Sequence, residues 1–345
     1  MKGVILAAGK GTRMREVSLG LPKILLPFGD RTIGDNIAEG LRDAGAREIL
    51  LVVGHMEEQV REHFGDGSAL GLTIHYARQT QQLGTGHAAS LARDFVGDEP
   101  LFVLCYGDIA TPSENLVGLV NDFRSQSPAM SMSIFRVQDP SAGAAVYVED
   151  GYMKRLIEKP PPGASTTAFD NAGIYVFTPA VFEVLDRVGL SPRNEYELTD
   201  VLMMVAAAGG GVRAYELNGF WSNVSSPEDL LGINHRVIDG LKEKAFSGAS
   251  DGRRGPDISS LAIVHREAVL GKCSVGDYTI VMRGACVGDG AKLSHSIVCR
   301  DVVIGQDASL DHVLVRPGTA VAPSTTCLGT GGRVVILPDE MRQEG

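Results

Sequence analysis

The chain has 345 residues, of which 44% are hydrophobic and 21% are charged, and its formal net charge is −10. This length and composition are typical of a soluble globular protein with one large domain or two domains. The acidic balance argues against a nucleic-acid groove or an anionic membrane surface as the main partner, because both require a surplus of Lys and Arg.

No stretch approaches the roughly 20 apolar residues that a membrane span requires, and the first residues read as a strand without a signal-peptide pattern. We therefore expect a cytoplasmic protein. An odd number of cysteines with no Cys-x-x-Cys pair argues against a zinc site and a disulfide framework, and indicates small core-filling thiols. The five cysteines are Cys105, Cys273, Cys286, Cys299 and Cys327.

The first feature along the chain is residues 3–13, Gly-Val-Ile-Leu-Ala-Ala-Gly-Lys-Gly-Thr-Arg. The aliphatic run predicts a buried parallel strand, and the small residues after it let backbone N–H groups approach an anion closely. The turn is neither a dinucleotide fingerprint nor a P-loop. Taken alone, it fits a phosphate cradle or an ordinary strand-to-helix connection equally well. Next, residues 21–27 hold Lys23 between two prolines, where its ammonium can meet an anion or simply be solvated.

Residues 31–64 alternate a helical pattern over 31–47, a strand over 48–54 and a helix over 56–64, and a strand over 72–76 follows. This alternation predicts an α/β fold with binding loops at the carboxyl ends of the strands. A second glycine-rich loop, residues 79–90, begins with Gln79, whose amide can read a base edge because it offers both a donor and an acceptor. A plain helix entry is the alternative.

Residues 100–108 form an apolar run that ends in Gly-Asp, which puts the carboxylate of Asp108 at the carboxyl edge of the predicted sheet. An Asp in this position commonly holds Mg²⁺ for phosphoryl chemistry, and capping of the next helix is the alternative. Two strands follow residues 139–143, and another covers 170–177. Glu158 and Asn171 offer an acceptor and an amide that suit sugar hydroxyls or an acetamido group, although turn chemistry would also explain them.

The last part of the chain changes texture after a helix from Pro227, capped by Ser226, to about Lys244 and a linker over 247–256. Aliphatic residues then recur every six positions, with small residues four positions after most of them. This period predicts a left-handed parallel β-helix of roughly four coils, with sandwich strands as the alternative. Its exposed faces are expected to pack on another subunit. The aliphatic series is Ile263, Val269, Val275, Val281, Val287, Leu293, Ile304, Leu310, Val315, Val321 and Cys327.

Taken together, these stretches resemble the sugar-phosphate nucleotidylyltransferase family. The family motif Leu-Ala-Ala-Gly-x-Gly-Thr-Arg is met at 6–13 and Pro-Lys at 22–23, and the later motifs follow in order. These are Gly-Asp at 107–108, Glu-Lys-Pro at 158–160, Asn-Ala-Gly-Ile-Tyr at 171–175 and Leu-Thr-Asp at 198–200. The resemblance implies a Rossmann-like α/β catalytic domain with a mostly parallel mixed sheet over 1–235, a helix end and linker over 236–258, and the β-helix over 259–338.

The resemblance also implies a role for particular residues. Catalytic roles fall on Arg13, Lys23 and Asp108, and Mg²⁺ would be held by Asp108 and Asn223. Nucleotide contacts fall on Leu6, Ala8, Gly9, Gly11, Thr12, Gln79, Gly84 and Thr85. Sugar-phosphate contacts fall on Tyr106, Gly143, Glu158, Lys159 and Asn171.

In such enzymes a sugar-1-phosphate attacks the α-phosphorus of a nucleoside triphosphate and expels pyrophosphate. Asn223 replaces the Asp of the Trp-x-Asp found in many thymidylyl- and guanylyltransferases. N-acetylglucosamine-1-phosphate uridylyltransferases use Asn there, and share Gln-Leu-Gly-Thr-Gly-His-Ala at 82–88 and Tyr-Gly-Asp at 106–108. We therefore expect UTP with N-acetylglucosamine-1-phosphate or glucose-1-phosphate, in a homo-oligomer without nucleic-acid or membrane partners.

Three alternatives stay open at this point. One is thymidylyl transfer from dTTP to glucose-1-phosphate, because thymidylyltransferases share the 158–175 motifs. The second is guanylyl transfer to mannose-1-phosphate. Another is a non-catalytic nucleotide-sugar sensor, which Asn223 suggests. Acetyl transfer by the β-helix is disfavoured, because His265, His295 and His312 are scattered and no inserted catalytic loop is evident.

Overall fold

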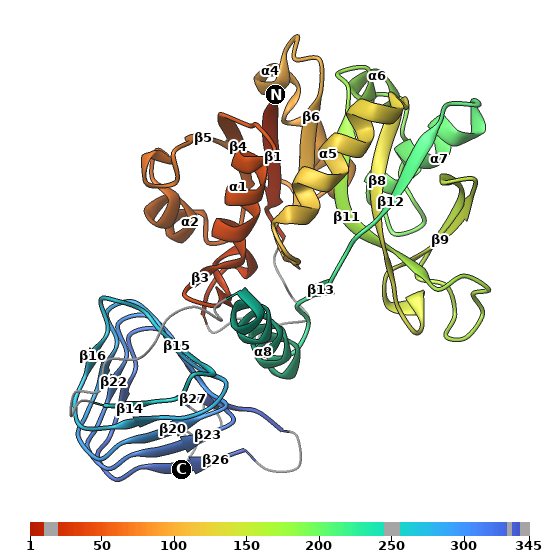
Figure 1. The fold of residues 1–345 in the computed structure, drawn as a ribbon. Coiled ribbons are helices and arrows are strands. Elements are labelled where there is room, and N and C mark those ends of the chain that lie inside the picture. Colours follow the sequence, from red (N-terminus) through yellow and green to blue (C-terminus); the bar gives the residue numbers. More distant parts are fainter. Residues whose placement is uncertain (10–19, 245–255, 330–332, 339–345) are drawn as a thin grey trace. The chain divides into compact units, whose positions relative to one another are not determined.

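A computed structural model describes residues 1–9, 20–244, 256–329 and 333–338 (Figure 1). The chain divides into two compact units, and each is described by itself. The first is formed by Met1–Lys10 with Gly34–Asn223, and the second by Gly11–Ile33 with Val224–Gly345. The boundaries at 235 and 258 stay predictions of the sequence.

The first unit contains a nine-stranded mixed sheet among its described residues, in the order β5-β4-β1-β6-β11-β8-β12-β10-β9. Strands β5, β4, β1 and β6 run parallel to one another, and β11 is antiparallel to both β6 and β8. The predicted α/β fold is confirmed. The strands are β1 (Lys2–Ala7), β4 (Glu48–Val53), β5 (Thr73–Arg78), β6 (Phe102–Tyr106), β8 (Met130–Arg136), β9 (Ala144–Glu149), β10 (Tyr152–Glu158), β11 (Phe169–Phe177) and β12 (Val212–Glu216).

Helices cover both faces of this sheet, which is why strands such as β1 are apolar at successive positions. Val4 belongs to the core on the face that α3, α6 and α7 cover, whereas Gly3 lies against Leu41 of α1. The helices are α1 (Ile33–Asp43), α2 (Glu57–Phe64), η3 (Ser68–Leu70), α3 (Thr85–Ser90), α4 (Arg93–Val96), α5 (Glu114–Gln126), η4 (Pro140–Ala142), α6 (Val181–Leu185) and α7 (Leu198–Ala207). A separate ribbon pairs β7 (Ile109–Ala110) with β13 (Ser222–Asn223).

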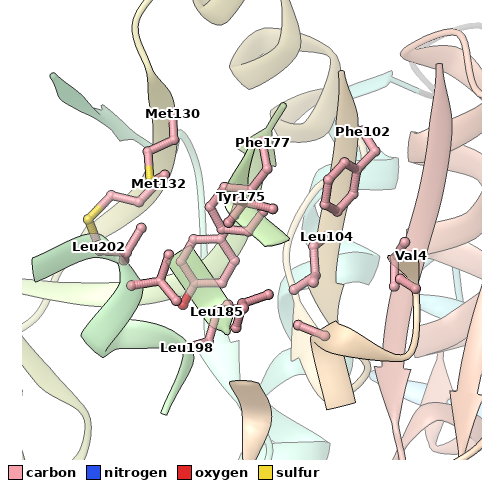
Figure 2. Packing of buried hydrophobic residues seen from close by; sticks show 14 of the residues in the cluster. Val4, Phe102, Leu104, Met130, Met132, Tyr175, Phe177, Leu185, Leu198 and Leu202 are labelled. Atoms are coloured by element: carbon pink, nitrogen blue, oxygen red, sulfur yellow. The ribbon is translucent and has the colours of Figure 1, made fainter. Parts of the chain in front are cut away.

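The core of the first unit is centred on aromatic rings from β6 and β11 (Figure 2). The Tyr175 and Phe177 rings stack with centroids 5.5 Å apart, and Phe102 stacks on Phe182 at 5.5 Å. Figure 2 shows Leu198 and Leu202 of α7 lying against this group. These side chains are almost completely buried, so the core holds β6 and β11 in place. The residues at the ends of these strands are positioned by the same packing.

The second unit contains the β-helix, whose described strands form three parallel sheets, as predicted (Figure 1). One sheet is β14 (Asp257–Ile258), β17 (Ser274–Val275), β20 (Lys292–Ser294), β23 (Ser309–Asp311) and β26 (Thr326–Leu328). The next is β15 (Ala262–Val264), β18 (Thr279–Val281), β21 (Ile297–Val298), β24 (Val313–Val315) and β27 (Val335–Leu337). The third is β16 (Val269–Leu270), β19 (Cys286–Val287), β22 (Val303–Ile304) and β25 (Ala320–Val321). The same unit holds η2 (Lys23–Leu25), β2 (Pro27–Phe28), β3 (Arg31–Thr32) and α8 (Pro227–Lys244).

The expected inward series of the β-helix is wrong at its first two positions. Strand pairing aligns Val264 with Val281 and Leu270 with Val287, so the inward residues lie one place after Ile263 and Val269. The Val269 side chain is 62% exposed. The physical reason is that the inward residues Leu270 and Val275 are five positions apart instead of six. An uninterrupted period of six, counted back from Val275, gives Val269 and Ile263 instead.

The predicted start of α8 is confirmed. Helix α8 runs from Pro227 to Lys244, and the Ser226 hydroxyl accepts a hydrogen bond from the Asp229 N–H at 3.0 Å, as an N-cap does. The five cysteines are all free. In the described ranges, none of the helices is both long and apolar enough to span a membrane.

Candidate active site

The carboxyl ends of β1 and β6 meet at one edge of the sheet, because these strands are parallel neighbours with Leu6 opposite Tyr106. Gly107 continues this contact by donating its N–H to the Leu6 carbonyl at 2.9 Å. A Cβ at Gly107 would lie 2.9 Å from that oxygen, so a larger residue would displace the turn. Asp108, which follows and is half-buried, is therefore held beside the turn after β1.

The described part of the turn after β1 is anchored at Ala8 and exposed at Gly9. The Gln82 side chain donates to the Ala8 carbonyl at 2.7 Å, and the backbone of Gly54, after β4, packs against Ala8. Gly9 is exposed, and a Cβ built on it meets no described atom within 4 Å. The predicted nucleotide residues Gly11 and Thr12, with the predicted catalytic Arg13, lie outside the described residues.

The second glycine-rich loop is held against the segment before α7. Gly84 has a φ of +100°, and a Cβ there would lie 2.5 Å from the Tyr196 carbonyl, so glycine is required. The Thr85 hydroxyl accepts a hydrogen bond from the Leu198 N–H at 3.0 Å. Gln79 is 7% exposed, and its Nε2 donates to the Gly84 carbonyl at 3.1 Å. These contacts give Gln79 and Thr85 loop-anchoring roles beside their predicted nucleotide contacts.

A polar cluster lies around Glu158, at the end of β10. Its Oε1 accepts a hydrogen bond from the Thr199 hydroxyl at 2.9 Å, and its Oε2 lies 3.7 Å from a nitrogen of Arg193. Burial raises the pKa of Glu158, whereas Thr199 and Arg193 oppose that rise. Arg193 also pairs with Glu197 at 2.9 Å. The carboxylate is thus oriented and only partly solvated, as a selective hydrogen-bond acceptor should be.

Gly143, which is hydrogen-bonded to Lys159, lies beside a buried acid, Asp170. The Lys159 N–H donates to the Gly143 carbonyl at 2.8 Å, and Lys159 itself has a φ of +43°. The Asp170 carboxylate, 5% exposed, accepts from the Ala144 N–H at 2.6 Å. A Cβ on Gly143 would lie 2.3 Å from both Asp170 oxygens. Burial raises the pKa of Asp170 to about 6, with the Ala144 and Asn171 N–H groups opposing the rise.

Asn171 and Tyr106 meet through Tyr175. The Asn171 amide donates to the Tyr175 hydroxyl at 2.7 Å, and the Tyr175 and Tyr106 hydroxyl oxygens are 3.2 Å apart. Burial raises the pKa of both tyrosines well above the ordinary range, so both hydroxyls stay protonated. The irregular register between Asn171 and Tyr175 turns the Asn171 amide toward this pair. Gly173, at φ +76°, leaves room for the Tyr106 ring.

The ribbon of β7 and β13 holds one predicted metal ligand, Asn223, and the other, Asp108, directly precedes β7. Asn223 pairs with Ile109, the residue directly after Asp108. A carboxylate and an amide oxygen are ligands that Mg²⁺ accepts, and a two-ligand protein site leaves positions for substrate phosphates. The donor set therefore fits a hard divalent ion.

Lys23 opens η2 in the second unit, so its position is described within that unit only. The main site features that sequence reasoning missed are Asp170 and Arg193, with Glu197 and Thr199 beside them. Thr199 lies within the Leu-Thr-Asp motif and Asp170 directly precedes Asn171, which were the only signals available.

Comparison with known proteins assigns this architecture. Residues 2–240 match the family model described as nucleotidyl transferase. The chain is 35% identical over 253 residues to the low-salt glycan biosynthesis nucleotidyltransferase Agl11 of Haloferax volcanii, covering 73% of this chain and 70% of that protein. It is 32% identical over 244 residues to glucose-1-phosphate thymidylyltransferase of Streptomyces griseus, covering 69% of this chain and 66% of that protein.

The fold also matches a solved structure, that of a UDP-glucose pyrophosphorylase complexed with UDP-glucose. The TM-score is 0.60 at 22% identity, over 70% of this chain and 98% of that one, which is a likeness of fold. The family match spans well over half of the chain, from the start of β1 into α8, the helix after Asn223. The chain therefore belongs to the nucleotidyl transferase family and is an enzyme of that class.

Proposed function

We propose that the protein transfers UMP from UTP to a hexose-1-phosphate, N-acetylglucosamine-1-phosphate or glucose-1-phosphate, and releases pyrophosphate. The observation that carries this proposal is the edge of the sheet in the first unit. There the exposed Gly9 follows β1, and the hydroxyl-binding groups Glu158 and Asn171 belong to β10 and β11 of the same sheet. The oxygen ligands Asp108 and Asn223 lie between β6 and β7 and on β13, in the ribbon that continues from β6.

The reaction forms a bond between a sugar-phosphate oxygen and the α-phosphorus of the triphosphate, and breaks the bond from that phosphorus to the oxygen of the leaving pyrophosphate. The attacking phosphate is already ionised near neutral pH, so no general base is needed and catalysis consists of alignment and charge neutralisation. In this proposal the N–H groups of Gly9 and Gly11 hold the triphosphate. Arg13 stabilises the leaving pyrophosphate, and Lys23 meets the reacting phosphates.

Asp108 and Asn223 would hold Mg²⁺, which supplies positive charge to the substrate phosphates when bound. The amide of Asn223 contributes an oxygen but no charge. The site therefore carries one formal negative charge from these two ligands, and binding should depend strongly on the phosphates that enter with the substrates.

The sugar is assigned to the antiparallel part of the sheet. Glu158 can accept from sugar hydroxyls because Thr199 and Arg193 keep its carboxylate oriented. The Tyr106 hydroxyl and the Asn171 amide lie together through Tyr175 and can meet a hydroxyl or an acetamido group. Gly143 and Lys159 are joined by a backbone hydrogen bond and complete this side.

The base is assigned to Gln79. Its amide nitrogen is engaged by Gly84 and lies 3.0 Å from His87 Nδ1, so its oxygen is oriented as an acceptor for the N3–H of a pyrimidine dione. Uracil and thymine both carry this group. The motif at 82–88 favours UTP. The likeness to a glucose-1-phosphate thymidylyltransferase of Streptomyces griseus makes dTTP the second candidate.

The test is a matrix of pyrophosphate-release assays, with UTP, dTTP, GTP, CTP and ATP each offered against glucose-, N-acetylglucosamine- and mannose-1-phosphate. We expect the highest kcat/KM with UTP. A preference for dTTP replaces UTP with the second candidate, and a preference for GTP with mannose-1-phosphate contradicts both. Nucleotide-sugar binding without pyrophosphate release from any pair would identify a sensor instead of an enzyme.

A homo-oligomer through the β-helix is part of the proposal. Strand pairing aligns Val269, Cys286, Val303 and Ala320 on one sheet, and Val269 and Val303 are 62% and 51% exposed. Such a contiguous apolar row supports burial against another copy. Sedimentation of the full chain, with Val303→Lys expected to weaken association, tests it.

A further inference from the structure

The β-helix carries a column of aromatic and imidazole rings at one of its turns. Tyr278, His295 and His312 occupy the same turn in successive coils, and all three have positive φ, between 44° and 56°. The His295 N–H donates to the Asp277 carbonyl at 2.8 Å, and the His312 N–H to the Ser294 carbonyl at 3.3 Å. These bonds stack the turns, so the His295 and His312 rings lie 4.6 Å apart and nearly parallel.

One carboxylate faces both imidazoles of this column. Asp311 Oδ1 lies 3.3 Å from His295 Nδ1, and Oδ2 lies 2.9 Å from His312 Nδ1. The Ser294 hydroxyl, in register with Asp311 on the neighbouring coil, donates to Oδ1 and fixes the carboxylate. Among the described residues, this is the only group of three His, Cys, Asp or Glu side chains with ligand atoms all within 4.8 Å of one another.

We infer that His295, Asp311 and His312 form a binding site for a divalent transition-metal ion of the zinc class. Two imidazole nitrogens and a carboxylate oxygen are a donor set that zinc accepts, and on a tetrahedral ion with bonds of about 2.1 Å such atoms lie roughly 3.4 Å apart. His295 Nδ1 lies 3.3 Å from Oδ1 of Asp311 and His312 Nδ1 lies 2.9 Å from Oδ2, and one ligand atom from each residue lies within 4.8 Å of the others, so small side-chain movements bring them to this spacing. The ion takes the place of the hydrogen bonds between Asp311 and the two rings.

Binding requires one adjustment of the rings. Parallel imidazoles direct their in-plane lone pairs along parallel lines, so at least one ring rotates about its Cβ–Cγ bond to point at a shared ion. Both histidine side chains are 35% exposed, and Asp311 is 34% exposed, which leaves room for this rotation and for a water as fourth ligand. The site differs from the Asp108 and Asn223 pair in ligand chemistry, since nitrogen donors select transition metals over Mg²⁺.

The consequence of the site is a cross-link between coils. His295 follows β20, whereas Asp311 ends β23 and His312 follows it, so one ion joins two successive turns of the β-helix. An ion that binds only the folded coils stabilises them in proportion to its affinity and concentration. We therefore expect zinc to raise the unfolding temperature of the β-helix without supplying chemistry to nucleotidyl transfer.

The experiment titrates Zn²⁺ and Co²⁺ into the chelator-stripped full chain in a large excess of Mg²⁺, which occupies oxygen-ligand sites. Isothermal titration calorimetry should give one zinc ion per chain, and Co²⁺ should give the visible absorption of a tetrahedral nitrogen and oxygen site. His312→Gln and Asp311→Asn should each weaken binding by about 10-fold or more. His265→Gln, which changes a histidine of the β-helix outside the group, should leave binding unchanged.

Circular dichroism establishes whether each variant is folded, and either variant alone suffices if the other unfolds. Two results would overturn the inference. One is the absence of stoichiometric Zn²⁺ and Co²⁺ binding to the wild type. The other is binding that folded His312→Gln or Asp311→Asn does not weaken. Either result would leave the group as a hydrogen-bonded column that connects the coils without an ion.

Discussion

The sheet of the first unit and the β-helix of the second are both built largely from stacked strands, but they bury different kinds of residue. In the described β-helix the fully buried positions are almost all aliphatic or small, and Thr279 and Ser296 are the buried polar exceptions. The sheet buries Gln79, Asp170 and Glu197 close to its strand ends. Because burying polar groups costs stability unless they are paired, these buried groups support the site proposed at this edge of the sheet.

We expect Asp108→Asn to reduce the activity proposed for the first unit and to leave the stability of the β-helix unchanged. The change removes the only charge that the proposed metal pair contributes, so pyrophosphate release should fall by about 1,000-fold. Asp98→Asn, an exposed position, is the control and should retain the wild-type rate. Near wild-type turnover in folded Asp108→Asn would remove this residue from the site.

We expect Leu293→Ala to destabilise the β-helix and to leave the activity proposed for the first unit unchanged. Leu293 is 2% exposed and pairs with Val275 and Leu310 across the coils, so its truncation should cost about 2–5 kcal/mol of β-helix stability. The measurement is urea unfolding followed by circular dichroism, with exposed Lys292→Ala as the control. If turnover below the unfolding transition falls in parallel, the β-helix also contributes to nucleotidyl transfer.

Asp170 should make the stability of the first unit depend on pH. Its pKa of about 6 exceeds the ordinary value near 3.9, so the folded protein holds this proton more tightly than the unfolded chain does. This contribution to stability is complete below about pH 4 and is lost as the pH rises to about 6, by on the order of 3 kcal/mol. Urea unfolding across this range should show the wild type losing stability relative to Asp170→Asn as the pH rises, and a pH-independent difference would contradict the prediction.

Gly143→Ala is expected to have the smallest effect. The new Cβ meets the Asp170 carboxylate, so the backbone at 143 must shift, and the KM for the sugar phosphate should rise about 10-fold with a smaller change for the triphosphate. Gly189→Ala, where a Cβ meets nothing within 4 Å, is the matched control. An equal rise in both KM values would assign Gly143 a general structural role.

The elements that could be predicted from sequence are those that local patterns determine. The apolar run of β1, the Ser226 cap of α8 and the hexad spacing each follow from residues close together in the chain. Asp108 could be placed because it directly follows a strand. Ile263 and Val269 were misplaced because a single five-residue step shifts the register without any change of composition.

The contacts that could not be predicted join distant segments. Asp170 lies over Gly143 only because β9 pairs with β11, with Asp170 opposite Ala145. Arg193 reaches Glu158 from the segment before α7. Neither contact produces a recognisable spacing of residues in the sequence. Asn223 is predicted by resemblance to the family, and its pairing with Ile109 is apparent only in the structure.

The reversal of strand direction between β6 and β11 has a consequence for how specificity can change. Gln79, assigned to the base, follows the parallel strand β5, whereas Glu158 and Asn171, assigned to the sugar, belong to the antiparallel strands. Tyr106, also assigned to the sugar, ends β6 at the boundary between the two parts of the sheet.

The second glycine-rich loop nevertheless links the two groups, because Gly84 packs on Tyr196 and Thr85 accepts a hydrogen bond from the Leu198 N–H. Glu197 and Thr199 of the Glu158 cluster belong to the same segment. We therefore expect a backbone shift in the base-side loop to alter sugar binding as well.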